Sequence, residues 1–262
     1  MLVFRITSAV MRKTSIDFAS LNTTPPKSDL AMNTTTLHYI YDPLCGWCYG
    51  AAPLVKAARE VVSVRPHGGG MMAGARRQTV TSRLRDFVRP HDAQIAQLSG
   101  QRFGERYLDG LLCDVTAVFD SEPPTVAMLA AETLAGRGLD MLAQLQIAHY
   151  VEGRRIADSE VLIDVAAMLG LDPASFAEAL DSLSGGPVQA HFKETHVFMA
   201  KIGAQGFPTF VLETPEGLRI VDFAGYLGRP QDFQNWLRGQ TATSVSSQAA
   251  KALRCDVNGC VI

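Results

Sequence analysis

Apolar and polar residues alternate along Leu37–Tyr41 and again along Ser63–His67, and each run predicts a short β-strand. Residues 51–62, between them, have a helical pattern, which we expect Pro53 to interrupt because proline removes a hydrogen bond and bends the axis. A strand, a helix and a second strand in this order predict a parallel pair. The glycines at 68–70 then either bring the backbone close to another segment or a bound group, or form a plain flexible turn.

The strand signal is absent from about Thr79 to Leu183, where the pattern is helical. We expect Arg89–Asp92 and Gly100 to divide the first part of this segment into short helices. Later helices begin at clear capping signals, namely Asp120–Pro124, Asp158 and Asp172–Pro173. A long run of capped amphipathic helices without strands predicts a helical subdomain.

Strands return near the C-terminal end of the chain. A helix is predicted from Pro187 to about Ile202, and a hairpin follows with strands at 206–212 and 218–223. Residues 231–237 predict a short closing helix, and the Ser/Thr-rich residues 240–248 predict a flexible tether.

These elements predict an α/β fold in which the two ends of the chain share one small mixed sheet. The predicted organisation is a leader or misassigned start (1–36), a sheet domain made from two segments (37–78 and 187–239), an inserted helical subdomain (79–186), and a flexible tail with a second cysteine pair (240–262).

Composition excludes several classes of protein. The chain has 262 residues, 47% of them apolar and 19% charged, with a formal net charge of −2. It has no long basic run, which argues against a nucleic-acid partner. No apolar run approaches the roughly 18 residues that span a bilayer, so we expect no membrane partner. Because Arg5 interrupts the only candidate secretory signal, we predict a cytoplasmic location.

The candidate chemistry lies in LHYIYDPLCGWCYG, residues 37–50, where the first predicted strand gives way to a helix. Cys45 and Cys48 are three residues apart, a spacing that places both side chains on one helix face, close enough for a disulfide. A helix N-terminus presents free N–H groups and a positive dipole end, which stabilise a thiolate at Cys45. Since the thiolate is the form that attacks disulfides, the pattern indicates a redox site.

Gly206-Phe207-Pro208-Thr209 before the hairpin, together with the CGWC segment and the proline in the following helix, makes the chain resemble a thioredoxin-fold protein. The helical insertion makes it similar to the DsbA family, in particular to its FrnE-like, predicted protein-disulfide isomerase branch. The residues 119–123 (FDSEP) and 150–158 (YVEGRRIAD) also carry the resemblance, which runs from about Leu37 to Trp236. It implies a thioredoxin fold with a large all-helical insertion, and a cis peptide bond at Pro208 that faces the active-site disulfide.

From these features we predict a thiol–disulfide oxidoreductase with isomerase potential, in which Cys45 is the nucleophile and Cys48 resolves the mixed disulfide. Pro208 completes the site, and the predicted substrate-binding residues are Gly46, Trp47, Phe207 and Thr209. The expected partners are protein thiols and disulfides, with glutathione or a thioredoxin-like protein as recycling partner. No cofactor and no metal are expected, because the cysteines themselves hold the electrons.

Three alternatives remain at this point. The cysteines could bind zinc, although a structural zinc site usually has four ligands. The chain could be a glutathione-using enzyme related to kappa-class transferases or 2-hydroxychromene-2-carboxylate isomerase, but those generally have a serine near the position of Cys45. It could also be a binding module, such as a chaperone, in which the cysteines are incidental.

Five cysteines leave three outside the CGWC segment. Cys255 and Cys260 are either an auxiliary redox pair that exchanges with Cys45 and Cys48, as some FrnE-like proteins carry, or two stray thiols in a disordered end. Cys113 follows two leucines and is expected to be a small, partly buried apolar residue.

Overall fold

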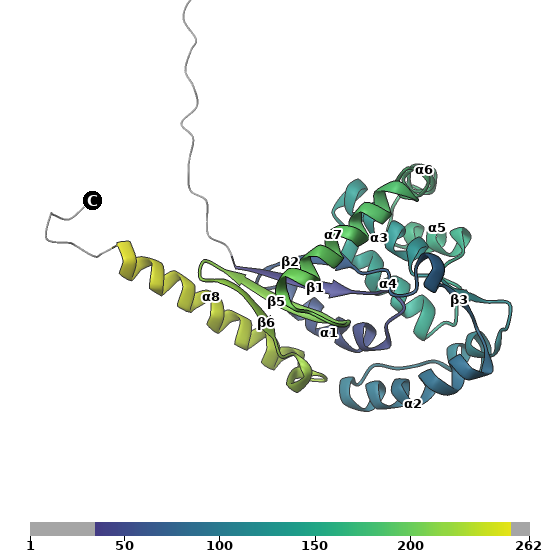
Figure 1. The fold of residues 1–262 in the computed structure, drawn as a ribbon, viewed down its shortest axis with the longest axis horizontal. Helices are drawn as coiled ribbons and strands as arrows, with labels where there is room; N and C mark the ends of the chain where they lie inside the picture. The colour runs from purple at the N-terminus through teal and green to yellow at the C-terminus, as the bar shows by residue number, and fades with distance from the viewer. Residues whose placement is uncertain (1–34, 253–262) are drawn as a thin grey trace, which may run out of the picture. The chain divides into compact units, whose positions relative to one another are not determined.

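A four-stranded mixed sheet lies at the centre of the fold (Figure 1). The structure is a computed structural model that describes residues 35–252, with side chains described as far as Thr241. The strand order is β2-β1-β5-β6, and the strands are β1 (Thr36–Tyr41), β2 (Ser63–Gly68), β5 (Thr209–Thr214) and β6 (Gly217–Val221). As predicted, β1 and β2 are parallel and β5 and β6 form an antiparallel hairpin; β5 pairs antiparallel with β1, which joins the two ends of the chain.

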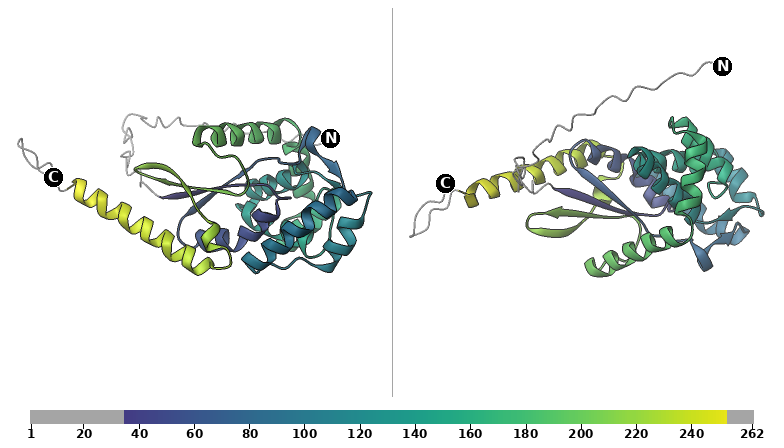
Figure 2. Two further views of the ribbon diagram at one scale, coloured as in Figure 1. Left: turned by 60° about the horizontal axis from the view of Figure 1, so that its bottom comes forward. Right: turned by 90° about the horizontal axis from the view of Figure 1, so that it is seen from above.

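Alternate residues of β1 face two different layers, as the period of a strand requires. Leu37, Tyr39 and Tyr41 are buried in a cluster with side chains of α1 (Gly46–Arg59) and α8 (Pro230–Ala252). Ile40 faces the other way and packs with Met199 of α7 (Gly186–Ile202). The sheet is therefore covered by α1 and α8 on one face and by α7 on the other (Figure 2).

The helical segment lies in the sequence between β2 and α7. Its longer helices are α2 (Ser82–Ser99), α3 (Glu122–Ala135), α4 (Gly138–Tyr150), α5 (Ser159–Met168) and α6 (Pro173–Leu183). Short helical turns are η1 (Gly74–Arg76), η2 (Arg106–Gly110), η3 (Leu111–Cys113) and, after the hairpin, η4 (Ala224–Tyr226). The capping signals predicted the starts of α3, α5 and α6 correctly; Asp172, for example, accepts a hydrogen bond from the backbone N–H of Ser175 at 2.9 Å.

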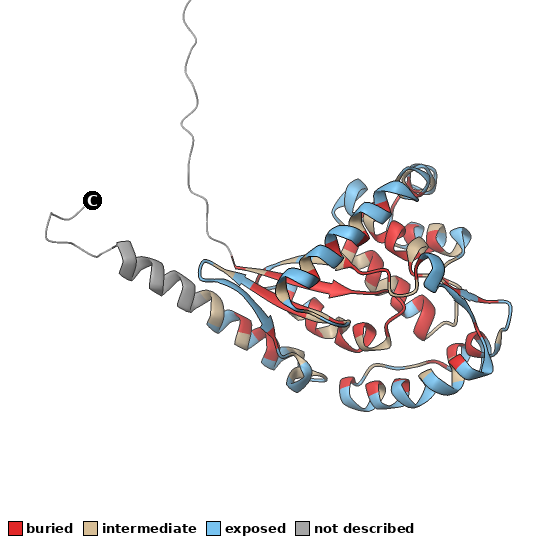
Figure 3. Ribbon diagram, viewed as in Figure 1, coloured by how far each residue is buried: buried red, intermediate tan, exposed pale blue. Residues whose placement is uncertain are grey.

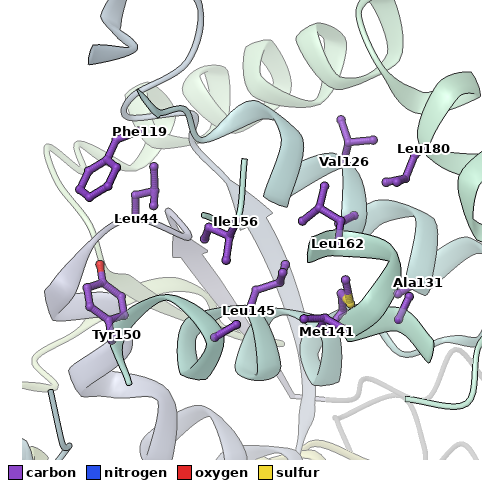
Figure 4. Close-up of a cluster of buried hydrophobic side chains, with 14 of the residues drawn as sticks. Leu44, Phe119, Val126, Ala131, Met141, Leu145, Tyr150, Ile156, Leu162 and Leu180 are labelled. Carbon is purple, nitrogen blue, oxygen red and sulfur yellow. The ribbon is translucent and has the colours of Figure 1, made fainter. Parts of the chain in front are cut away.

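The helical segment has its own apolar core, which also includes residues of the active-site loop. Leu44, which directly precedes Cys45, belongs to this core (Figure 4). Tyr49 of α1 belongs to it as well. Tyr49 stacks on Tyr150 of α4 with the ring centroids 4.8 Å apart. Most residues of α3 and α4 that face this core are buried, whereas the outer faces of α5 and α6 are exposed (Figure 3). The helices therefore support the loop that carries the cysteines.

The prediction that Pro90 breaks a helix was wrong, because α2 continues through it to end at Gly100, which has a φ of 73°. The helix α1 also runs unbroken past Pro53, and the bend expected there stays a prediction. Pro53 leaves the carbonyl of Tyr49 without its helical partner, but the side-chain amide of Gln101 donates to that oxygen at 3.0 Å. A substitute donor therefore removes much of the cost of the proline.

Two further predictions need correction. A short two-stranded sheet, β3 (Gln78–Thr79) with β4 (Val118–Phe119), lies within the segment predicted to lack strands; its two-residue strands are too short to show a period. The closing helix α8 extends to Ala252, so residues 240–252 are helical rather than a flexible tether. The leader up to residue 34, and Cys255 and Cys260, lie outside the described residues.

Candidate active site

Cys45 is the N-cap residue of α1. Its backbone is extended, with φ −90° and ψ 114°, and its carbonyl accepts hydrogen bonds from the N–H groups of Cys48 at 3.0 Å and Tyr49 at 3.1 Å. The residue as a whole is 7% exposed and thus buried, although it lines a cleft. Its place at the N-terminus of α1 puts it at the positive end of the helix dipole, which stabilises a thiolate.

Cys48 lies one turn further along α1 and is fully buried, with 0% exposure. The backbone N–H of Asp42 donates to its sulfur at 3.5 Å, and the Tyr39 hydroxyl donates to its carbonyl at 3.2 Å. Burial raises the pKa of Cys48 well above its ordinary value, and the neighbouring Cys45 raises it further. Cys48 is thus shielded from external reagents and kept as a thiol.

The loop before β5 reaches Cys45 from the far end of the chain. The Phe207–Pro208 peptide bond is cis, as the resemblance implies, and the Cys45 thiol donates to the carbonyl oxygen of Phe207 at 3.5 Å. The ring of Phe207 lies against Gly69, where a β-carbon would come within 2.1 Å of it. Of the two interpretations of the three glycines, close approach to another segment is the correct one at Gly69.

Asp42 was not identified as a site residue from the sequence, although it directly precedes Pro43 at the end of β1. It has 0% exposure, and burial is the main cause that raises its pKa. Its Oδ1 accepts from the N–H of Leu44 at 2.9 Å and the hydroxyl of Ser121 at 2.8 Å, and its Oδ2 accepts from the N–H of Met71 at 2.5 Å. Asp42 therefore joins the cysteine loop to the segment after β2, at Met71, and to the residue that precedes α3, Ser121.

A cleft of about 520 Å³ opens beside Cys45. Gly46 and Trp47 line it, and their role in substrate binding stays a prediction; most of the opposite wall comes from α2. Phe87 of α2 is 65% exposed at this wall. The residues that line the cleft are Leu44, Cys45, Gly46, Trp47, Met71, Met72, Gln78, Thr81, Arg83, Leu84, Phe87, Val88, His91, Asp92 and Ile95. The cleft is thus largely apolar, with Arg83, His91 and Asp92 as its ionisable groups besides Cys45.

Two glycines of α1, Gly46 and Gly50, allow α2 to pack closely against α1. A β-carbon at Gly46 would lie 3.0 Å from both Oδ1 of Asp92 and Cδ1 of Ile95, and one at Gly50 would lie 2.7 Å from Cγ2 of Ile95. Residues four apart share one helix face, so Gly46 and Gly50 form a flat strip against α2.

The other predicted site residues are placed differently. Thr209 does not line the cleft; its hydroxyl donates to the carbonyl of Gly206 at 2.7 Å and stabilises the loop around Pro208. Cys255 and Cys260 are outside the described residues. Cys113 is exposed, contrary to expectation, because it ends a short surface turn, and its sulfur lies 3.9 Å from Nη1 of Arg85.

Comparison with known families and structures identifies close relatives of this arrangement. Residues 36–225 match the DSBA-like thioredoxin domain family. The chain is 56% identical to the cytosolic disulfide reductase DsbM from Pseudomonas aeruginosa, with a TM-score of 0.75 over 79% of this chain and 99% of that chain. For the structure of DsbM with glutathione (GSH), the identity is 55% and the TM-score 0.73, over 78% of this chain and 98% of that chain.

A candidate protein disulfide isomerase from Nitrosomonas europaea is 21% identical, with a TM-score of 0.64 over 80% of this chain and 98% of that chain, a likeness that shows the fold alone. None of the curated protein sequences matches the chain. Among the described residues, no helix combines the length and apolar character needed to cross a membrane.

Proposed function

The chain belongs to the DSBA-like thioredoxin domain family, and from this premise we propose that it is a thiol–disulfide oxidoreductase that reduces disulfides through Cys45 and Cys48. The observation that carries the proposal is the geometry of Cys45, which caps α1 with its sulfur 3.5 Å from the carbonyl of Phe207, beside the cis peptide bond at Pro208. The identity of 56% to a disulfide reductase over nearly its whole length supports the reductive direction.

The first step is attack of the Cys45 thiolate on one sulfur of a substrate disulfide. A bond forms between Cys45 and that sulfur, and the other sulfur leaves as a thiolate and takes up a proton. Cys48 then loses its proton and attacks the sulfur of Cys45, which closes the Cys45–Cys48 disulfide and releases the second substrate thiol. Counted from its dithiol form, the enzyme loses two electrons and two protons, one proton when Cys45 ionises and one from Cys48, and the substrate gains the same.

The raised pKa of Cys48 fits its place in this order. A buried thiol does not compete for the substrate, and it becomes a nucleophile only after Cys45 has been converted into part of a mixed disulfide. That conversion removes the negative charge of the Cys45 sulfur, which, like the charge of Asp42, opposes ionisation of Cys48. The two cysteines therefore react in sequence rather than at random.

The substrate and recycling partners follow from the cleft. Its apolar wall, with Phe87 exposed, suits the side chains of a protein or peptide disulfide, and Pro208 lacks an N–H, which leaves neighbouring backbone groups free to pair with an extended peptide. Glutathione is the proposed thiol that restores the dithiol, supported by the structure of DsbM with GSH. We further propose a cytoplasmic location, in agreement with the cytosolic relative.

The fold alone does not separate this function from the glutathione-using alternative. The chain is 16% identical to a 2-hydroxychromene-2-carboxylate isomerase, with a TM-score of 0.51 over 79% of this chain and 98% of that chain, so that the two share the fold. The presence of both cysteines, one capping the helix and one buried behind it, favours disulfide exchange.

Single cysteine variants test the proposal. With bis(2-hydroxyethyl) disulfide as substrate and glutathione as reductant, Cys45→Ser is expected to abolish turnover. Cys48→Ala is expected to accumulate a mixed disulfide at Cys45, detectable by mass spectrometry of the intact protein. Cys113→Ser, at an exposed site, serves as the control with unchanged turnover. Full activity in Cys45→Ser would exclude the proposed function.

A further inference from the structure

Asp92 is a buried acid in the wall of the active-site cleft. It is 4% exposed and lies on α2, on the face that packs against the CGWC segment. Its Oδ1 lies 3.0 Å from the position that a β-carbon on Gly46 would occupy, so the carboxyl group is directly beside the residue that follows Cys45. Gly46 and Asp92 both line the cleft, and the absence of a side chain at Gly46 leaves room beside this oxygen.

The two oxygens of Asp92 have different surroundings. Oδ2 accepts a hydrogen bond from the buried hydroxyl of Tyr107 at 2.9 Å, which fixes the orientation of the carboxyl group. Within the described part of the chain, no group donates a hydrogen bond to Oδ1. A carboxylate held in place by one oxygen, with the other free at a cleft, is an arrangement that receives a donor from a ligand.

Neither the sequence pattern nor the disulfide exchange steps require this acid. Cys45 and Cys48 carry the electrons, and Asp42 already joins the surrounding segments. A buried carboxylate without a cationic partner carries a desolvation cost, which a ligand's positive charge would offset.

We propose that Asp92 is a specificity-determining residue that binds an ammonium group of the substrate, so that disulfides with an ammonium close to the sulfur are preferred. This inference rests on the proposed oxidoreductase function and adds a substrate class to it. Cys45, Gly46 and Asp92 line the same cleft, and Gly46 lies between Cys45 in the sequence and Oδ1 in space. In the proposed complex, the group two carbons from the substrate sulfur therefore lies beside Oδ1 when the mixed disulfide forms at Cys45.

The ionisation of Asp92 supports the same assignment. Burial raises the pKa of Asp92 to about 6, against the opposing hydrogen bond from Tyr107. The other ionisable groups that face it are Tyr107 from η2, Tyr150 from α4, and His91 on its own helix. Above pH 6 the carboxyl group is ionised and attracts an ammonium, and below pH 6 it is neutral and loses that attraction.

Three small disulfides of similar size test the proposal directly. Cystamine carries an ammonium two carbons from each sulfur, bis(2-hydroxyethyl) disulfide carries a neutral hydroxyl, and 3,3′-dithiodipropionate carries a carboxylate. The value of kcat/KM for each is measured with the wild type and with Asp92→Asn, and the ratio between two disulfides is compared between the proteins. Intrinsic reactivity cancels in this comparison, because each disulfide has the same leaving group with either enzyme.

In Asp92→Asn, the ratio of kcat/KM for cystamine to kcat/KM for bis(2-hydroxyethyl) disulfide is expected to fall on the order of tenfold, which corresponds to the loss of one hydrogen bond to a charged group. The relative activity on 3,3′-dithiodipropionate is expected to rise. Activity on the neutral disulfide should persist. Asp86→Asn is the matched control, since Asp86 is an exposed acid on the same helix that does not line the cleft. An unchanged ratio in Asp92→Asn would overturn the proposal.

The pH profile of the wild type gives a second test that does not depend on the folding of Asp92→Asn. The preference for cystamine should fall away as the pH drops through about 6. His91 lines the same cleft, and its protonation would also repel an ammonium, so the profile is repeated with His91→Gln, which should keep the fall. A flat profile would refute the role of Asp92, whereas failure of the wild type to reduce any of the three disulfides would refute the proposed function itself.

Discussion

The Cys45 thiol donates to the carbonyl oxygen of Phe207 at 3.5 Å, a contact between residues 162 positions apart in the sequence. It joins the start of α1 to the loop that precedes β5, and thus the two segments that form the sheet. Because the contact uses the backbone of Phe207, it depends on the path of the loop and not on the identity of a side chain. Changes that move this loop should therefore alter the reactivity of Cys45 without touching it.

The first prediction concerns the order in which the cysteines react with an external reagent. Cys45 is 7% exposed at a helix N-terminus, whereas Cys48 is 0% exposed and burial raises its pKa. Brief treatment of the reduced protein with iodoacetamide should alkylate Cys45 at least roughly tenfold faster than Cys48. Peptide mapping is needed to separate these adducts from that of the exposed Cys113. Preferential labelling of Cys48 would reverse the assigned roles.

The second prediction concerns Gly69. A β-carbon there would lie 2.1 Å from Cε1 and Cζ of Phe207, so Gly69→Ala must displace the ring and with it the loop before Pro208. We expect a loss of about 1–3 kcal/mol in the free energy of unfolding, which is typical of overpacking, and reduced turnover of disulfides. Gly186→Ala, at the start of α7 with no atom within 4 Å, should change neither quantity. If Gly69→Ala and Gly186→Ala have the same free energy of unfolding in urea and the same turnover, the ring of Phe207 moves aside without cost and the prediction is wrong.

The third prediction concerns His149 and acid stability. Its ring packs against Tyr107, Phe119 and Tyr150, and burial lowers its pKa to about 3 from the ordinary 6.5. Below pH 6.5 the unfolded chain binds a proton at this residue that the folded chain does not bind until about pH 3. The free energy of unfolding should therefore decrease as the pH falls through this range, by up to about 1.4 kcal/mol per pH unit from this residue.

Replacing His149 with Phe keeps an aromatic ring and removes the proton. The loss of stability between pH 7.5 and pH 5.5 should then be smaller by about 1 kcal/mol in urea unfolding. Burial also lowers the pKa of His67, to about 4. His67 therefore contributes to the loss of stability at low pH in the same direction, and part of the pH dependence should remain in His149→Phe. The exposed His91→Phe is the control; an identical pH dependence in wild type and His149→Phe would contradict the prediction.

The elements that could be predicted from the sequence are those whose signals lie within a few neighbouring residues. The parallel strands and the hairpin were predicted from alternation of apolar residues, and the starts of α3, α5 and α6 from caps, because both signals lie within a few residues. The outcome at Pro53 depended on Gln101, and the pairing of β3 with β4 joins residues about forty positions apart. Neither could be found by examining a short window of sequence.

The site divides in the same way. Cys45 and Cys48 are identified by their spacing and by their place between a strand and a helix. Asp42 and Asp92 are not, since their partners Ser121, Tyr107 and Gly46 are brought to them only by the folded chain. A single acidic residue carries no pattern, and its importance becomes visible only through its burial and its hydrogen bonds.

The last prediction concerns Cys255 and Cys260, and the expectation that they form an auxiliary redox pair. Both lie outside the described residues, and α8 continues as a helix to Ala252. At a rise of 1.5 Å per residue, the helical stretch beyond the buried Leu237 advances the chain by about 20 Å. A helix is not a flexible tether, so the reach expected of a flexible chain does not apply to residues 240–252.

Cys48→Ala in a Cys113→Ser background removes the competing thiols and tests this exchange. If the tail pair acts as a relay, mild oxidation should give a disulfide between Cys45 and Cys255 or Cys260, identified by peptide mapping. Dilution separates the two routes, because a bond within one molecule forms at a rate independent of protein concentration and a bond between molecules does not. A chain ending at Gln240 keeps the buried Phe233 and Leu237 of α8, so its turnover reports on the tail rather than on folding. Unchanged turnover in that shortened chain, with no disulfide from Cys45 to the tail, would show that the pair takes no part in catalysis.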